Sequence, residues 1–185
     1  MRKLIRGLQI LWQRIRHQGL STTFWWALDH VARGLTGANI RRVSQITPHL
    51  YVGGQHRVHG MARMRRRGIT AVVNMRDEFD DEPAGLAFPH YLYLPTPDDG
   101  APTLEHLQLG AEFIADQIED GGVVYVHCGS GIGRAATMAA AYFVHQGMSP
   151  GEAWDRIRQN RPFIRPTLVQ IEQLKHFAGQ VTGNQ

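Results

Sequence analysis

The stretch from Val123 to Met138 constrains the fold more than any other part of the chain. It begins with β-branched and aromatic residues, continues with three glycines within five positions, and ends in residues that favour helix. This order predicts a strand, a tight loop and a helix. Backbone N–H groups of the loop and of the helix N-terminus would point into one concavity, where the helix dipole favours an anion. We therefore expect the loop to bind a phosphate.

Two side chains at the ends of this loop supply chemistry. Cys128 ends the strand and Arg134 follows six positions later. A cradle that attracts phosphate also favours a thiolate, so Cys128 is the candidate nucleophile, and the planar fork of Arg134 can hold two phosphoryl oxygens. A lone cysteine can also be a small buried apolar residue, but strand, glycines and arginine together favour catalysis. The phosphate-binding amides would come from Gly129, Ser130, Gly131, Ile132, Gly133 and Arg134.

The segment His127-Cys128-x-x-Gly131-x-x-Arg134 resembles the signature of the cysteine-dependent protein tyrosine phosphatases, dual-specificity branch. The resemblance covers about residues 43 to 178. It implies an α/β fold with a central, mostly parallel sheet flanked by helices, and hydrolysis through a phosphocysteine with no cofactor and no metal. Because His127 precedes the loop on a buried strand, we expect it to position the loop by hydrogen bonding rather than to transfer protons.

The leaving oxygen needs a proton, and the signature loop has no residue able to give one. Residues 95–102 hold three prolines and a glycine and are predicted to form a loop. Within it, Pro97-Asp98 resembles the acid loop of small dual-specificity phosphatases, thirty residues before Cys128. Asp98 is therefore the candidate general acid. Asp99 is the alternative, because the length of this loop varies in the family.

One residue departs from the family pattern. Serine or threonine usually follows the arginine, and its hydroxyl stabilises the leaving thiolate in the second step, whereas this chain has Ala135. The resemblance then implies slow hydrolysis of the intermediate. Thr137 could replace the missing hydroxyl only if it reaches the sulfur. A catalytically weak protein that binds phosphate or acts as a membrane scaffold is therefore an alternative to an enzyme.

Strand and helix patterns alternate along the rest of the chain, which favours a mostly parallel sheet between helices. Strands are predicted at 46–54, as a pair, and at 70–75, 90–94 and 123–128; helices are predicted at 55–67, 103–120, 134–145, from 150 and at 167–178. Thr103 and the pair Ser149 and Glu152 are expected to cap helices.

The strand over 70–75 is followed by Arg76, at the sheet edge where ligands bind in such folds. Arg76 is a candidate second contact for an anionic substrate, or it pairs with Asp77 or Glu78 to hold the loop. The acidic run over 77–82 is expected to be a solvated loop at the pocket rim. His56 and His59 have helical spacing, but no further ligand lies in their segment, so a zinc site is not expected.

The N-terminus differs in charge from the remainder. Residues 1–43 carry eight Lys or Arg and one acid, while the later residues carry twelve basic and fifteen acidic side chains. The folded domain is therefore mildly acidic, which argues against nucleic acid as a partner. We expect an extension over 1–42, a phosphatase domain over 43–180 and a tail over 181–185. The single cysteine excludes an internal disulfide and suits a reducing compartment, such as the cytoplasm.

The extension contains two amphipathic segments, a basic one over 2–16 and one with apolar residues at helical spacing over 24–35, ended by Gly34 and Gly37. Neither can span a bilayer. An anchor lying on an anionic membrane surface and a hairpin packed on the domain or on a second subunit are both open. The oligomeric state also stays open.

The substrate class follows from the resemblance. Proteins phosphorylated on tyrosine, serine or threonine are the expected substrates. The uncharged side chains at Gly129, Ser130, Ile132 and Gly133 count against polyphosphorylated head groups. However, residues 98–104 and 123–138 also resemble the mitochondrial phosphatidylglycerophosphate phosphatases, and the basic N-terminus suits a phospholipid substrate at a membrane surface. A phospholipid phosphatase is therefore the alternative.

Overall fold

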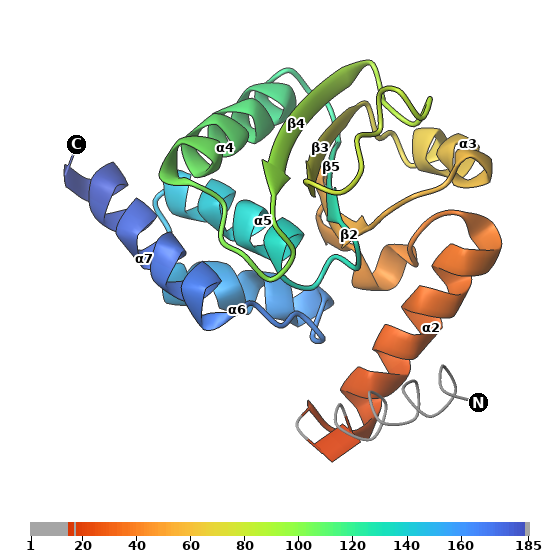
Figure 1. Cartoon of the computed structure of the whole chain (residues 1–185), viewed down its shortest axis with the longest axis horizontal. Helices are drawn as coiled ribbons and strands as arrows, with labels where there is room; N and C mark the ends of the chain where they lie inside the picture. The colour runs from red at the N-terminus through yellow and green to blue at the C-terminus, as the bar shows by residue number, and fades with distance from the viewer. Residues whose placement is uncertain (1–14, 17, 184–185) are drawn as a thin grey trace.

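The computed structural model describes residues 15, 16 and 18–183 (Figure 1). The predicted basic helix over 2–16 lies almost entirely outside the described residues. In chain order the elements are α2 Leu20–Thr36, a 3-10 turn Arg41–Val43, β1 Gln45–Thr47, β2 Leu50–Gly54, α3 Val58–Arg66, β3 Ala71–Arg76, β4 His90–Thr96, α4 Leu104–Glu119, β5 Val124–Cys128, α5 Arg134–His145, α6 Pro150–Asn160 and α7 Leu168–Gly183. The predicted alternation of strands and helices is confirmed.

A central five-stranded sheet organises the molecule, in the order β1-β2-β5-β3-β4. Only the β1–β2 pair is antiparallel, and the other neighbours run parallel. The mostly parallel sheet expected from the sequence is therefore confirmed. Strand β5 lies in the middle of the sheet, between β2 and β3, and is buried along its whole length. The loop that follows Cys128 therefore begins at the centre of the carboxyl edge, where an α/β sheet places its ligands.

The two faces of the sheet are covered unequally. Helix α5, most of whose residues are buried, lies on one face of the sheet with α4, α6 and α7 packed around it, and α3 covers the other face (Figure 1). Side chains of β5 alternate between the two sides, as a strand with period two requires: Val124, Val126 and Cys128 join the larger core, and Tyr125 joins the smaller. The side chain of Cys128 therefore lies on the face of the sheet that α5 covers.

Helix ends follow the capping residues in the sequence. Thr103 accepts a hydrogen bond from the His106 amide, and Ser149 with Glu152 forms a complete capping box. Gly37 ends α2 in the left-handed conformation that favours glycine. The prediction that Gly34 also ends this helix was wrong, since Gly34 lies within it.

Two other boundaries also differ from the predictions. Helix α3 starts at Val58, three residues later than predicted, because the chain first leaves β2 in an extended conformation. Helix α7 continues to Gly183, beyond the predicted end at 178.

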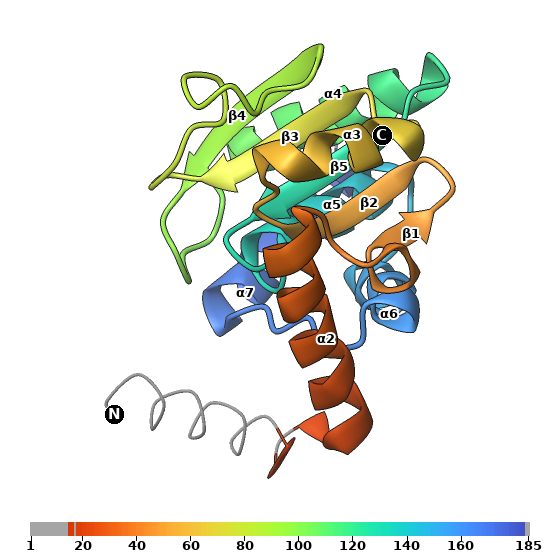
Figure 2. The ribbon, with the colours of Figure 1, turned by 90° about the vertical axis from the view of Figure 1, so that its right-hand side faces the viewer.

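Helix α2 runs away from the body of the molecule, with its N-terminal end farthest from the sheet (Figure 2). Its buried residues are polar, Thr23 and Asp29. The apolar stripe that the sequence shows at helical spacing points to solvent; it consists of Leu20, Phe24, Leu28, Val31 and Leu35. Over the described residues, each helix is too short or too polar to cross a membrane.

Candidate active site

The loop after β5 turns its backbone carbonyls outward. The Gly129 carbonyl accepts hydrogen bonds from Arg33 Nη1 at 2.9 Å and from the Gln55 amide at 3.2 Å. Arg161 donates to the next two carbonyls, from Nη2 to Ser130 at 3.0 Å and from Nε to Gly131 at 2.6 Å. The Ile132 carbonyl accepts from the Arg165 amide at 2.7 Å. Because successive carbonyls are held behind the loop, N–H groups are left to face the concave side. The Gly131 amide lies 3.2 Å from Cys128 Sγ and donates to it.

Gly131 is required by geometry. Its φ is +68°, in the left-handed region, and a Cβ there would lie 2.2 Å from the carbonyl carbon of Gly53. A side chain at position 131 would push the loop away from β2. Glycine at position 131 therefore allows the loop to lie directly against Gly53 of β2.

Arg161 supports the loop from inside the protein. Its side chain is fully buried, and burial is the main reason that its pKa lies below the usual value. Asp29 of α2 opposes this effect with a carboxylate oxygen 3.4 Å from Nη1 and Nη2. Asp29 is held in turn by Asn39 Nδ2 at 2.6 Å and the Ile40 amide at 2.8 Å. Residues before position 43 thus form part of the wall behind the phosphate loop.

Arg134, the first residue of α5, points its guanidinium across the carboxyl edge of the sheet toward Glu78. The pair is bidentate, Nη1 to Oε2 at 2.8 Å and Nη2 to Oε1 at 3.0 Å. The hydrogen bond from Arg134 holds the pKa of Glu78 far below its usual range. Burial acts to lower the pKa of Arg134, but the bond to Glu78 and the charges of Cys128 and Asp98 raise it. Arg134 is therefore a fixed cation.

The prediction that residues 77–82 form only a solvated rim was wrong. Glu78 holds Arg134, and Asp81 in the same run is completely buried. Arg76 donates to Glu78 Oε1 at 2.9 Å and to Gln55 Oε1 at 2.9 Å. Of the two roles considered for Arg76, pairing with Glu78 to hold the loop is the one that the structure shows. Sequence reasoning named Glu78 only as a possible partner of Arg76 and missed its bond to Arg134. The signal for that role was the position of Glu78 just after the carboxyl end of a buried strand.

The loop that carries the candidate acids is fixed to the start of α7. The Asp99 carbonyl accepts from Thr167 Oγ1 at 3.0 Å, and the Gly100 carbonyl accepts from Gln170 Nε2 at 2.7 Å. This brings Asp98 Oδ1 to 2.7 Å from Arg134 Nη2. The Nε atom of Arg134 is buried and has no hydrogen-bond partner within the described part of the chain. The Nε and Nη2 edge of Arg134 is the part of the guanidinium left for an anion that displaces Asp98.

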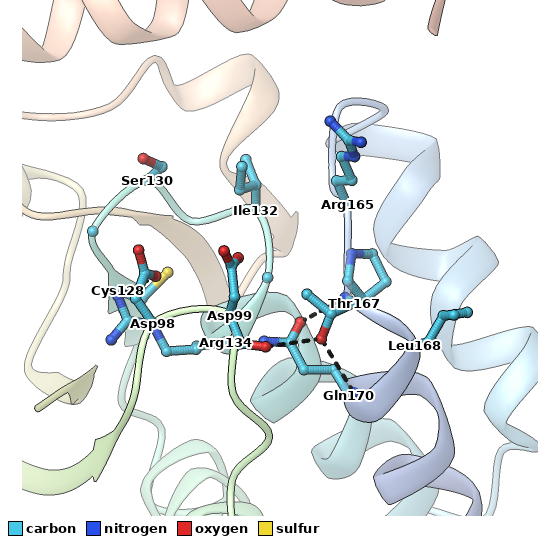
Figure 3. Close-up of a pocket in the computed structure, with 13 residues that line it drawn as sticks. Asp98, Asp99, Cys128, Ser130, Ile132, Arg134, Arg165, Thr167, Leu168 and Gln170 are labelled. Carbon is cyan, nitrogen blue, oxygen red and sulfur yellow. Dashed lines mark hydrogen bonds and ion pairs between the residues drawn. The ribbon is translucent and has the colours of Figure 1, made fainter. Parts of the chain in front are cut away.

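Cys128, the loop, both aspartates and the segment before α7 line one cavity of about 620 Å³ (Figure 3). Asp98 and Asp99 approach it from one side, and Arg165 and Thr167 from the other. Asp99 has a φ of +59°, which an aspartate tolerates better than most residues. The structure thus brings Cys128, Arg134, Asp98 and Asp99 to one cavity, as the sequence predicted, but does not add Arg76 to its lining.

Thr137 does not substitute for the hydroxyl that Ala135 lacks. Its Oγ1 donates to the Gly133 carbonyl at 3.1 Å, one helical turn back, so its single proton is not directed at the sulfur. Ala135 is completely buried at the start of α5. The position that could carry the hydroxyl is therefore occupied by a methyl group.

Cys128 with the Gly131 amide on its sulfur, the buried guanidinium of Arg134 and the carboxylate of Asp98 form the set of groups expected of a cysteine phosphatase. The family model "Dual specificity phosphatase, catalytic domain" matches residues 50–180. The chain therefore belongs to the dual specificity phosphatases, a branch of the cysteine-dependent protein tyrosine phosphatases, which confirms the resemblance seen in the sequence.

Relatives and solved structures agree with this membership. Protein phosphatase Slingshot homolog 3 of Mus musculus is 28% identical over 144 residues, which are 77% of this chain and 22% of the relative. Dual specificity protein phosphatase 14 of Mus musculus is 28% identical over 156 residues, 82% of this chain and 76% of the relative. The chain thus spans about a fifth of the length of the Slingshot relatives.

Among solved structures, PTPMT1 in complex with PI(5)P superposes with a TM-score of 0.69 at 29% identity, over 75% of this chain and 96% of that one. Human DUSP28 gives a TM-score of 0.69 at 22% identity, over 77% of this chain and 99% of that one, which supports the fold alone.

Proposed function

We propose that the protein hydrolyses phosphate monoesters through a phosphocysteine, with Cys128 as nucleophile, Arg134 and the loop amides as phosphate-binding groups and Asp98 as general acid. The observation that carries this proposal is the outward fixing of successive loop carbonyls, which leaves the N–H groups and the sulfur on the same concave side. Such preorganised donors stabilise charge on the phosphoryl oxygens without reorganising during the reaction.

In the first step the Cys128 thiolate attacks phosphorus, an S–P bond forms and the bond from phosphorus to the leaving oxygen breaks. A phosphoryl dianion would take the Nε and Nη2 edge of Arg134, where Asp98 Oδ1 now lies. Displaced from Arg134 and protonated by solvent, Asp98 lies next to the departing oxygen and gives that proton to it. Asp98 suits this role better than Asp99, whose carbonyl rather than carboxylate is the anchored group.

In the second step water attacks the phosphocysteine, the S–P bond breaks, and Asp98 accepts the proton from that water. The products are inorganic phosphate and the free thiolate. The Gly131 amide, 3.2 Å from the sulfur, stabilises the leaving thiolate in place of a hydroxyl at position 135. Because the amide acts without the second donor that a hydroxyl at position 135 would supply, we propose that this step limits turnover.

Phosphorylated proteins are the substrates that we propose first. The two relatives described above carry protein phosphatase names. The phosphate loop itself adds no lysine or arginine beyond Arg134 that would meet further phosphates. The acid loop and Arg165 both line the cavity, so both could contact a phosphorylated side chain that enters it.

A phospholipid phosphatase at a membrane surface is the second candidate. The exposed apolar stripe of α2 and the basic charge of the N-terminal residues fit an anionic membrane. The solved structure of PTPMT1 holds PI(5)P, a phosphorylated lipid, in a protein of the same fold. A protein that binds phosphate without turnover is the third interpretation.

The first experiment is hydrolysis of p-nitrophenyl phosphate in excess EDTA, with Cys128→Ser as control. Sustained release supports the enzyme, one stoichiometric burst supports a stalled intermediate, and no release from the wild type contradicts both.

A second experiment compares kcat/KM for phosphotyrosyl peptides, phosphoseryl peptides and phosphorylated lipids in anionic vesicles. Higher efficiency on peptides supports the main proposal. A lipid preference that falls in a Phe24→Ser, Leu28→Ser variant of the α2 stripe would instead favour the membrane candidate.

A further inference from the structure

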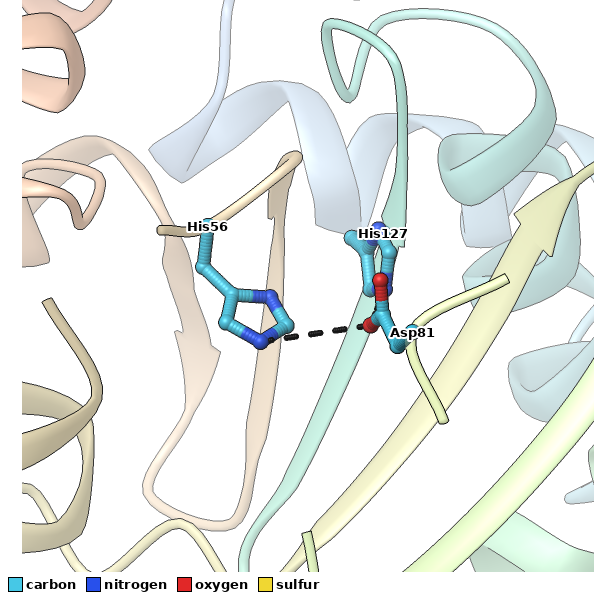
Figure 4. A group of neighbouring side chains, drawn as sticks. All are labelled: His56, Asp81 and His127. Carbon is cyan, nitrogen blue, oxygen red and sulfur yellow. Dashed lines mark hydrogen bonds and ion pairs between the residues drawn. The ribbon is translucent and has the colours of Figure 1, made fainter. Parts of the chain in front are cut away.

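Three buried side chains meet beside the phosphate loop: His56 from the link between β2 and α3, Asp81 from the loop after β3, and His127 from β5 (Figure 4). Their facing atoms lie within 4.8 Å of one another. His127 Nε2 is 2.8 Å from Asp81 Oδ2, and His56 Nε2 is 3.9 Å from the same oxygen and 2.9 Å from the Leu86 carbonyl. None of the three side chains lines the cavity that contains Cys128.

The partners fix where the protons are. A carboxylate and a carbonyl can only accept, so the Nε2 atoms of His56 and His127 must both carry the hydrogen. Both Nδ1 atoms are buried and have no hydrogen-bond partner in the described structure. Gln55 Nε2 donates to the other carboxylate oxygen of Asp81 at 2.7 Å. The carboxylate of Asp81 is thus the shared acceptor of the cluster.

The same protons argue against a bound cation here. A metal held through the two Nε2 atoms would move both protons to Nδ1, where the described protein offers no acceptor, whereas ligating histidines normally donate their second N–H. A hydrogen-bonded cluster satisfies the groups better than a metal site does.

The cluster joins the two halves of the candidate active site. His127 immediately precedes Cys128, and Asp81 follows three residues after Glu78, which holds Arg134 through two hydrogen bonds. The bond between His127 and Asp81 therefore fixes the loop that orients the guanidinium against the strand that carries the sulfur. His127 and Asp81 are 46 positions apart in the sequence, so this bond joins distant parts of the chain.

We propose that Asp81 is a positioning residue: by holding His127 in the Nε2–H tautomer, it sets the placement of Arg134 relative to Cys128. This inference rests on the proposed function. His56 encloses the pair, with its ring edge-on to His127 at 5.2 Å between centroids, and keeps water from the carboxylate. Asp81 touches no reacting atom and acts through His127 and Glu78.

The test is Asp81→Asn in the full chain. The asparagine side chain keeps the shape of the carboxylate, but only one of its two terminal atoms is an acceptor. Because His127 and Gln55 each donate to a different carboxylate oxygen, one of them loses its bond. We expect kcat/KM for p-nitrophenyl phosphate to fall at least tenfold, corresponding to about 1.4 kcal/mol, and nitrogen NMR to show that His127 no longer holds the Nε2–H tautomer alone. The matched control is Asp80→Asn, whose carboxylate accepts from Tyr91 Oη at 2.7 Å and does not contact His127.

A second pair of variants keeps the proposal testable if Asp81→Asn does not fold. His127→Gln can place a donor where Nε2 lies, and His127→Asn cannot. We expect His127→Gln to retain activity within about threefold and His127→Asn to lose at least tenfold, as expected for the loss of a buried hydrogen bond to a charged group.

Three results would overturn the proposal: a drop in melting temperature for Asp81→Asn with unchanged kcat/KM, equal activity of the two His127 variants, or stoichiometric metal in the purified protein. If the wild type shows no hydrolysis, the proposed function fails instead, and the tautomer and the affinity for tungstate still report on the positioning role of Asp81.

Discussion

Arg33 of α2 donates a hydrogen bond from Nη1 to the carbonyl oxygen of Gly129, 2.9 Å away and 96 positions later in the chain. The same nitrogen donates to the Gln55 carbonyl at 3.2 Å. A residue of the N-terminal segment therefore helps to turn the first carbonyl of the phosphate loop outward. Through this contact the loop geometry depends on a helix that lies outside the residues matched by the family model.

Replacing Arg33 by Met should therefore impair catalysis while leaving the fold intact. Methionine keeps the apolar stem but leaves the Gly129 carbonyl with the Gln55 amide alone, so the loop gains freedom. A hydrogen bond from a charged donor is worth about 1.5–3 kcal/mol, and we expect kcat/KM for p-nitrophenyl phosphate to fall at least tenfold. Arg41→Met is the control, because Arg41 contacts Gln45 and not the loop; an equal loss in both variants would contradict the argument.

Asp98→Ala should separate catalysis from anion binding. Loss of the general acid lowers kcat by about 10²- to 10⁴-fold. Because Asp98 competes for Arg134 Nη2 at 2.7 Å, its removal should also tighten the binding of tungstate, measured by calorimetry. Asp99→Ala should change both quantities little. A larger effect at Asp99 would transfer the acid role to that residue.

Ala135→Ser should speed the second step. A hydroxyl at the first turn of α5 adds a donor for the leaving thiolate beside the Gly131 amide. We expect kcat to rise and the burst of p-nitrophenol in stopped flow to shrink, while kcat/KM, which reports the attack by Cys128, stays unchanged. Ala136→Ser on the next position is the control. A rise in kcat/KM instead would place the effect on the first step.

Acid should destabilise the protein through His56. Burial, followed by the nearby His127, lowers the pKa of His56 from 6.5 to about 4. Between these values the unfolded chain binds a proton that the folded chain does not, so stability is complete above pH 6.5 and is lost as the pH falls toward 4. The loss amounts to about 3 kcal/mol. The free energy of unfolding, measured in urea at several pH values across this range, should fall with pH in the wild type and in the exposed control His59→Leu. In His56→Leu it should change less with pH.

The local part of the site could be predicted from the sequence. The sequence around Cys128 and Arg134 is contiguous, and its strand, glycines and helix each have a signal within a few residues. Asp98 was found because prolines mark its loop and the chemistry requires an acid. The alternation of strands and helices predicted the fold, and the signature from His127 to Arg134 carried the resemblance to the family.

The residues that support the loop could not be predicted in the same way. Glu78 and Asp81 lie in an acidic run whose composition indicates solvent, and Arg161 and Arg33 look like ordinary basic residues of helix ends. Their roles depend on contacts between segments that are far apart in sequence. Only the packing of the sheet edge shows that the charges of Glu78, Asp81 and Arg161 are paired, and that Asp81 and Arg161 are enclosed.

The buried pair of Arg161 and Asp29 has a practical consequence for anyone who shortens this protein. A version beginning at position 50, where the family match starts, would keep the cation and discard its only carboxylate partner in the described structure. Arg161 Nη1 would also lose the Val43 carbonyl at 2.8 Å, so the guanidinium that donates to two carbonyls of the phosphate loop would lack the partners that fix it. Trimming to the recognised boundary would therefore damage the centre of the molecule and not just its periphery.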